Sequence, residues 1–184
     1  MLPLLVMVVL NVVNLAYFFL VAVNLTGASR TATLYSIMGS STPAAAVLPS
    51  SGGASPTTNL ASVTYLTFQD MTGALGNPTG ASVRVCSPIN ITANSGVNGT
   101  GASLRSNCET CTSSGCSAAG AGSPLQPADP EAPNFILNQV LITYTFNTLI
   151  PGKLFNIPLQ ASPLCNSGGN CIFKRQASMR VLGP

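Results

Sequence analysis

The sequence is poor in charged side chains. They make up 6% of the 184 residues, against about 25% in an ordinary soluble domain. Residues 1–29 carry no charge, and Arg30 is the only charged residue before Asp70. The net charge of +3 comes from dispersed basic residues, of which only Lys174 and Arg175 are adjacent. We therefore expect no nucleic-acid partner, and a surface suited to self-association or to carrying sugars.

The absence of histidine restricts catalysis and metal binding. Acid–base chemistry would depend on carboxylates, lysine, tyrosine or cysteine, and the chain has only four acidic residues. Two of them, Asp129 and Glu131, lie in the proline-rich segment PADPEAP, where we expect solvated loop charges. The sequence also lacks a GxxxxGK[ST] phosphate loop and a GxSxG nucleophile elbow. We expect no enzyme, no cofactor and no metal site.

Six cysteines are present, and their even number indicates disulfides formed outside the cytoplasmic membrane. They are Cys86, Cys108, Cys111, Cys116, Cys165 and Cys171. The middle three resemble a metal cluster, but no fourth cysteine or histidine follows at a matching spacing. We predict a Cys165–Cys171 bond across the turn CNSGGNC. Cys86 is expected to pair with Cys108, Cys111 or Cys116, which leaves the other two to join.

An uncharged apolar run covers residues 4–25 and is long enough to cross a bilayer as a helix. A cleavable signal peptide fits poorly, because no basic residue precedes the run. The alternatives are a plain membrane anchor and an assembly helix, which resides in the membrane until the subunit is incorporated into a fibre. The helical pattern continues to a stop at Gly39, which predicts a rod of about 54 Å whose outer half must pack against protein.

Three asparagines interrupt this run. Asn11 and Asn14 lie three residues apart and share a helix face, whereas Asn24 lies near the end of the run. Because asparagine facing lipid is costly, we expect Asn11 and Asn14 to form hydrogen bonds with neighbouring helices. The predicted interface residues are Leu4, Val8, Asn11, Asn14, Leu15, Phe18, Val21 and Leu25.

Composition divides the chain into a hydrophobic helix (1–39), a Pro/Ser/Gly-rich linker (40–58) and a disulfide-containing globular head (59–184). In the head we expect a helix over 59–75, capped by Thr58 or Asn59, and strands over 81–91, 135–149 and 171–182. Residues 93–133 are expected to form a long loop that is cross-linked by disulfides through its three cysteines. The fold class is α+β, a long helix followed by a small antiparallel sheet with one packing helix.

Alternating residues predict which strand faces are buried. Val140, Ile142, Tyr144 and Phe146 share one face of their strand, opposite Leu141, Thr143 and Thr145. In the last strand, the apolar face carries Phe173, Ala177, Met179 and Val181.

Three triplets match the N-glycosylation pattern, at Asn24, Asn90 and Asn98. Such triplets arise easily by chance in a chain rich in Ser, Thr and Asn. Asn24 is expected to be buried in the helix, so Asn90 and Asn98 are the candidate acceptors.

Both ends of the chain resemble TadE-like pilins of the tight-adherence pilus system. The opening Leu2-Pro3 and the aliphatic run from Leu4 match the family's N-terminal helix, and VLITYTF and Ala177 to Arg180 match its closing strands. The family's Glu-Phe-Ala-Leu element and basic leader are absent, so we expect Met1 to lie within a longer precursor. The resemblance implies processing by a prepilin peptidase and partnership with pilus assembly machinery.

We therefore predict a structural subunit that polymerises with copies of itself into an extracellular filament, from a precursor held in the cytoplasmic membrane. The head would be exposed for adhesion or glycan decoration. The alternatives are a membrane-retained minor pilin-like component and a single-span anchored surface binding module.

Overall fold

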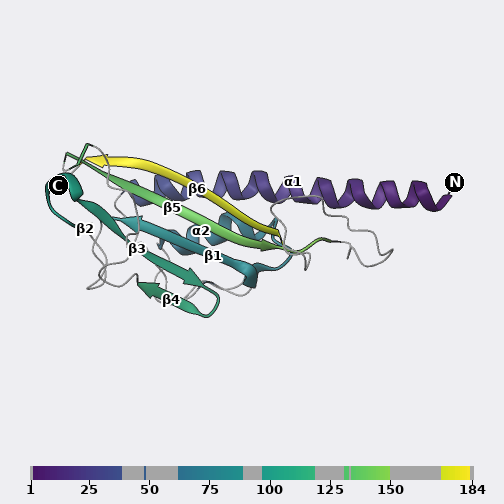
Figure 1. Ribbon diagram of the computed structural model, residues 1–184. Helices are drawn as coiled ribbons and strands as arrows, with labels where there is room; N and C mark the ends of the chain where they lie inside the picture. The colour runs from purple at the N-terminus through teal and green to yellow at the C-terminus, as the bar shows by residue number, and fades with distance from the viewer. Residues whose placement is uncertain are drawn as a thin grey trace.

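A 36-residue helix, α1 (Leu2–Ile37), extends at its N-terminal end well beyond the strands and the second helix that the structure describes (Figure 1). The computed structural model describes residues 2–38, 48, 62–88, 97–118, 131–132, 134–149 and 171–182. The helix is uninterrupted because its one proline stands in the first turn, where a missing N–H costs nothing. Its length is about 54 Å.

The C-terminal half of α1 lies against an antiparallel sheet. The strands are β1 (Ala81–Ser87), β2 (Val97–Asn98), β3 (Arg105–Thr112), β4 (Gly115–Ala118), β5 (Phe135–Phe146) and β6 (Cys171–Leu182). Their order is β2-β3-β1-β5-β6, and β4 also pairs with β3. The two longest strands, β5 and β6, pair over their full length from Phe135 with Leu182 to Phe146 with Cys171.

A second helix, α2 (Val63–Thr72), contacts both α1 and β1, so both helices cover the same face of the sheet (Figure 1). Short 3₁₀ turns at Pro78–Gly80 and Gly101–Ser103 lead into β1 and β3. The predicted α+β class, with one long helix, one packing helix and an antiparallel sheet, is confirmed.

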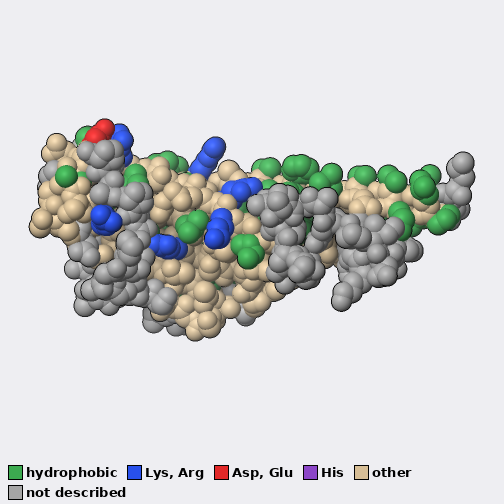
Figure 2. Space-filling model, in the orientation of Figure 1, with side chains coloured by type: hydrophobic (Ala, Val, Ile, Leu, Met, Phe, Trp, Pro, Cys, Tyr) green, Lys and Arg blue, Asp and Glu red, His purple; other side chains and the backbone are tan. Residues whose placement is uncertain are grey.

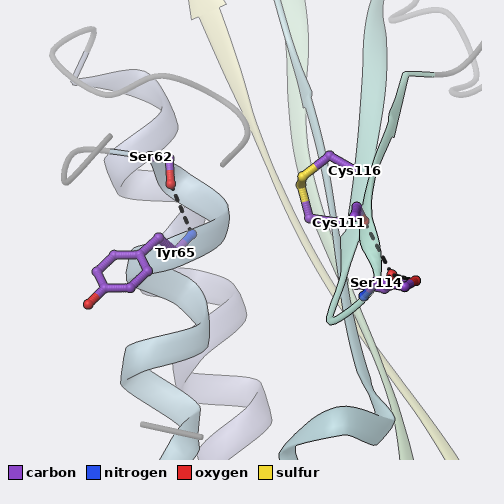
Figure 3. Close-up of a disulfide and its surroundings, with 7 residues drawn as sticks. Ser62, Tyr65, Cys111, Ser114 and Cys116 are labelled. Carbon is purple, nitrogen blue, oxygen red and sulfur yellow. Dashed lines mark hydrogen bonds between the residues drawn. A yellow bond between two sulfur atoms is a disulfide. The ribbon is translucent and has the colours of Figure 1, made fainter. Parts of the chain in front are cut away.

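The predicted bounds of α2 are wrong at both ends. The helix begins at Val63, where Ser62 is extended and its hydroxyl accepts a hydrogen bond from the Tyr65 N–H (Figure 3). Thr58 and Asn59, the predicted caps, lie outside the described residues. The helix ends at Thr72, three residues before the predicted end, and a turn follows at Gly73.

The interval 93–133 is not one long loop, as we predicted. It contains β2, β3 and β4, and β3 is a central strand that pairs with β1. The low hydrophobicity of RSNCETCT concealed this strand, because cysteines and small polar residues fill the positions that usually carry valine or isoleucine.

The strand-face predictions for β5 hold. Val140, Ile142, Tyr144 and Phe146 are buried against the helices. On β6 the odd-numbered residues from Cys171 to Met179 are buried or partly buried, and the even-numbered ones are exposed. The core also includes Leu48, from the predicted linker, whose N–H donates to the Thr112 carbonyl at 2.9 Å. At this residue the linker is packed against β3.

Candidate functional site

Residues 3–13, the N-terminal part of α1, extend beyond the sheet. We call them the projecting segment. Most of its side chains are exposed although they are apolar, and Leu4 is 70% exposed. Figure 2 shows hydrophobic side chains along this end of the molecule. By length and composition, α1 is the one described helix that could cross a membrane. A helix that is apolar all round requires lipid or other protein around it.

From Asn14 to Ile37, which we call the docked segment, one side of α1 packs on the head. Val21, Leu25, Ala28 and Ala32 form part of the common core with the sheet and α2. The opposite side is the outer face, which carries Leu15, Phe19, Val23, Arg30 and Leu34. Val23 is 71% exposed, so the apolar character of the projecting segment continues along this face.

The division of α1 into a side that packs on the head and an exposed outer face corrects the predicted subunit interface. Of its eight residues, Leu4, Val8, Asn11 and Leu15 are exposed. Phe18 is partly buried against the core, and Val21 and Leu25 are fully buried in it. The sequence could not separate the two sides, because residues 3–25 of α1 are apolar around the helix apart from three asparagines, and no polar stripe marks the solvent side.

The predicted asparagine pair is also divided by the fold. Asn11 is exposed, and its Nδ2 donates to the Met7 carbonyl of the same helix at 2.8 Å. Asn14 is only 8% exposed and is therefore part of its own subunit's interior, contrary to the prediction that it reaches a neighbouring helix. Asn24 is partly buried, and its Oδ1 has no hydrogen-bond partner within the described residues.

An aromatic cluster holds α1 where it meets the sheet. The Phe18 ring lies 4.7 Å from Phe173 and 5.7 Å from Phe146, centroid to centroid, and Tyr17 lies 5.3 Å from Phe146. The Tyr17 hydroxyl donates to the Ala74 carbonyl at 3.3 Å, which joins α1 to the turn that follows α2. We did not predict this cluster from the sequence. The available signal was the presence of aromatic residues both in the apolar run and near the adjacent ends of β5 and β6.

Further along, α1 contacts the sheet through small polar residues. Ser29, Thr33 and Ser36 are buried, and each hydroxyl donates to a backbone carbonyl of α1. Asn138 of β5 donates to Ser36, and Arg175 of β6 donates from Nε to the Thr26 hydroxyl at 3.2 Å. The bonds from Asn138 and Arg175 attach the docked segment to β5 and β6, so this segment belongs structurally to the head.

Two disulfides join neighbouring strands. Cys86 and Cys108 are register partners in β1 and β3, and Cys111 and Cys116 are partners in the β3–β4 hairpin. Figure 3 shows the second bond on the side of the sheet that faces the helices. This agrees with the predicted scheme for these four cysteines. Cys171 is also disulfide-bonded, but its predicted partner Cys165 lies outside the described residues.

The described titratable groups include one ion pair and three groups whose pKa is shifted by burial. Glu131, predicted to be a solvated loop charge, is partly exposed and pairs with Arg180 at 3.1 Å. Burial raises the pKa of Asp70, lowers that of Arg84 and raises that of Tyr144, whose hydroxyl accepts from the Asn77 N–H. Within the described residues no group of three His, Cys, Asp or Glu could hold a metal. Asp129 lies outside them.

The two candidate glycosylation sites are not tested by the described part of the chain. Asn90 lies outside it, and Asn98 lies in β2 with its side chain outside the description. Both remain predictions.

A long apolar N-terminal helix, with a projecting segment and a docked segment that packs on a disulfide-linked antiparallel sheet, is a pilin-like architecture. The helix and the disulfides indicate a protein that is secreted or membrane-anchored. No protein-family model matches the chain, and neither curated proteins nor solved structures give a match. The class therefore rests on the architecture described above.

Proposed function

We propose that this chain is the structural subunit of an extracellular pilus-like filament, and that it polymerises through α1. The observation that carries the proposal is the continuous apolar surface formed by the projecting segment and the outer face. It includes Leu4, Val8, Val12, Phe19 and Val23, all more than half exposed. Contiguous apolar patches of this kind mark interaction or membrane surfaces.

The geometry favours helix-on-helix assembly. In a bundle of such helices, the projecting segments would pack against one another and the heads would lie outside. Moving a helix from lipid to protein exchanges one apolar environment for another, so packing and polar contacts must supply the specificity. Asn11 is the described asparagine placed to contribute, since Asn14 is buried in its own subunit.

The resemblance to TadE-like pilins supports the same role. It brings the expectation of a membrane-held precursor, a prepilin peptidase and a dedicated assembly machinery. A structural role, without catalysis or nucleic-acid binding, fits the scarcity of charge and the absence of histidine. The disulfide-linked head would form the outer surface of the filament, available for adhesion or glycan decoration.

A second candidate, a membrane-retained pilin-like component, is favoured by one observation. By length and composition, α1 could cross a membrane. A spanning helix needs about 20 predominantly apolar residues, and the uncharged run 4–25 has that composition. The same helix therefore suits a permanent membrane span.

The test is cryo-electron microscopy of material sheared from cells that express the chain, in which the filament hypothesis expects fibres with a core of α1 helices. A Phe19→Asn/Val23→Asn variant should lose fibres while its head stays folded and disulfide-bonded. The control is Val97→Asn, at an exposed apolar residue of β2 away from α1. Fibres from the double variant would refute assembly through the outer face. Chain found only in the membrane fraction would favour the second candidate.

A further inference from the structure

The two helices carry one cation and one anion between them. Arg30 and Asp70 are the only charged residues in positions 1–83. Arg30 lies on the outer face of α1, Asp70 lies on α2, and both residues are exposed. Within the part of the chain that the structure describes, neither forms an ion pair. Each is therefore an isolated charge on an otherwise uncharged helix.

Arg30 and Asp70 of one subunit lie at different levels along α1. Helix α2 packs beside the docked segment and runs antiparallel to α1, because Ala74, just after the end of α2, bonds to Tyr17 near the start of that segment (Figure 1). Asp70 precedes Ala74 by four residues, which is about 6 Å of helix, whereas Arg30 follows Tyr17 by 13 residues, or about 20 Å. About 14 Å along α1 therefore separates the two charges, too far for them to meet within one subunit.

An exposed glycine lies beside each charge. Gly27 is three residues before Arg30, and Gly73 is three residues after Asp70. Neither glycine has a positive φ, and a Cβ added at either would meet nothing within 4 Å. The subunit itself therefore gives no reason for glycine, which is destabilising inside a helix relative to alanine. Small residues do allow two helices to approach closely.

We infer that in the filament Arg30 of one subunit forms an ion pair with Asp70 of a neighbouring subunit, where the outer face of α1 packs on the neighbour's α2. This inference rests on the proposed function. The occupant is a second copy because the two isolated charges are complementary. In an antiparallel contact, pairing Arg30 with Asp70 also brings Gly27 opposite Gly73.

The ion pair joins two different surfaces, so the contact can repeat from subunit to subunit along a fibre. Parallel subunits keep the antiparallel relation between α1 of one copy and α2 of the next. Because the two charges lie at different levels, the neighbours must be displaced by about 14 Å along α1. The ion pair therefore predicts the axial offset of the two subunits that it joins.

The environment of Asp70 in the single subunit supports a role in assembly. Burial raises the pKa of its carboxyl group, so the ionised form is disfavoured in the free subunit. A cation from a neighbouring subunit would favour that ionised form. Asp70 would therefore oppose folding of the subunit while it stabilises the fibre.

The test is a charge exchange in the full chain, read as the yield of fibres sheared from cells. Arg30→Asp and Asp70→Arg should each lower the yield by about tenfold or more, because like charges would then face each other across the contact. The double variant Arg30→Asp/Asp70→Arg restores opposite charges, and its yield should return to within about twofold of wild type. Thermal unfolding and disulfide mapping of each variant in detergent establish that the subunit is folded.

Lys174→Asp is the matched control, since it makes the same change of charge as Arg30→Asp. Lys174 is exposed on β6, and strand alternation places it on the side of the sheet away from the helices. It should change the fibre yield by less than about twofold.

Asp70→Asn separates a role in assembly from a structural role. It should lower the fibre yield by about fivefold, the effect of losing one ion pair, although it stabilises the subunit. A merely structural carboxylate would not change the two quantities in opposite directions.

Cryo-electron microscopy of wild-type fibres should show Arg30 against Asp70 of a neighbour displaced by about 14 Å along α1. A folded double variant with a yield as low as the single reversals, or an unchanged yield from Asp70→Asn, would overturn the ion pair and leave the filament standing. A map that separates Arg30 from Asp70 would do the same. Wild-type cells without fibres would overturn the filament, and the ion pair with it.

Discussion

The amide of Asn138 donates from Nδ2 to both the carbonyl oxygen of Ser36, at 3.1 Å, and its hydroxyl, at 3.0 Å. These residues are 102 positions apart in the sequence. The bond joins the last turn of α1 to the first half of β5, where both side chains are buried. It therefore helps to fix the position of α1 along the sheet.

Replacing Asn138 with Ala should release this last turn. A buried hydrogen bond lost in this way costs about 1–3 kcal/mol, because Ser36 keeps a buried carbonyl without its donor. We expect a lower thermal midpoint of the full chain in detergent and faster amide exchange in residues 34–37. Asn134→Ala, at an exposed position, is the control. Unchanged exchange in these residues would show that packing alone holds the turn.

The two described disulfides should differ in their contribution to stability. Cys86 and Cys108 are 22 residues apart, and Cys111 and Cys116 are 5 apart. Loop-closure entropy then predicts a loss of about 3 kcal/mol for Cys86→Ser/Cys108→Ser and about 2 kcal/mol for Cys111→Ser/Cys116→Ser. Denaturant unfolding of the two double variants measures the order. A reversed order would show that local packing of the hairpin outweighs chain entropy.

Gly76 and Tyr17 should be energetically coupled. A Cβ added at Gly76 would lie 2.5 Å from the Tyr17 hydroxyl oxygen, so Gly76→Ala must displace that hydroxyl. The displacement breaks the hydrogen bond from the Tyr17 hydroxyl to Ala74 and lowers the free energy of unfolding by about 1 kcal/mol or more. In a Tyr17→Phe background, Gly76→Ala should lower the free energy of unfolding by clearly less. A double-mutant cycle on thermal midpoints tests this, and additive effects would exclude the coupling.

The ionisation of Asp70 should oppose folding. Burial raises its pKa above the ordinary value of 3.8, so the folded state binds the proton more tightly than the unfolded state. Stability contributed by the protonated form is therefore lost as pH rises from about 3.8 through the folded pKa.

Asp70→Asn removes this titration, so the variant should melt at a higher temperature than wild type at pH 7. The two should melt together near pH 3, where both states carry a protonated Asp70. Glu131→Gln, which breaks the Arg180 pair, should not raise the midpoint at pH 7. A midpoint difference for Asp70→Asn that is the same at both pH values would contradict an electrostatic origin.

Several structural features followed from local patterns alone. The apolar run predicted α1, and the alternation of Val140, Ile142 and Tyr144 identified the buried face of β5. The cysteine spacing reduced the number of possible disulfide pairings. Ser62 was missed as the cap of α2 because Thr58 and Asn59 offer the same side-chain chemistry nearby. Strand β3 was missed because its partners β1 and β4 complete it through backbone hydrogen bonds, which leave little trace in side-chain hydrophobicity.

The sequence by itself determined that this chain has a long apolar helix, an antiparallel disulfide-linked head and almost no charge, because these properties reside in composition and short-range periodicity. Only the tertiary structure decided which side of α1 belongs to the head. Val21 and Val23 are equally apolar, yet one is fully buried and the other 71% exposed. The difference arises because strands β5 and β6, more than 100 residues later, cover one side of the helix and leave the other for lipid or a neighbouring subunit.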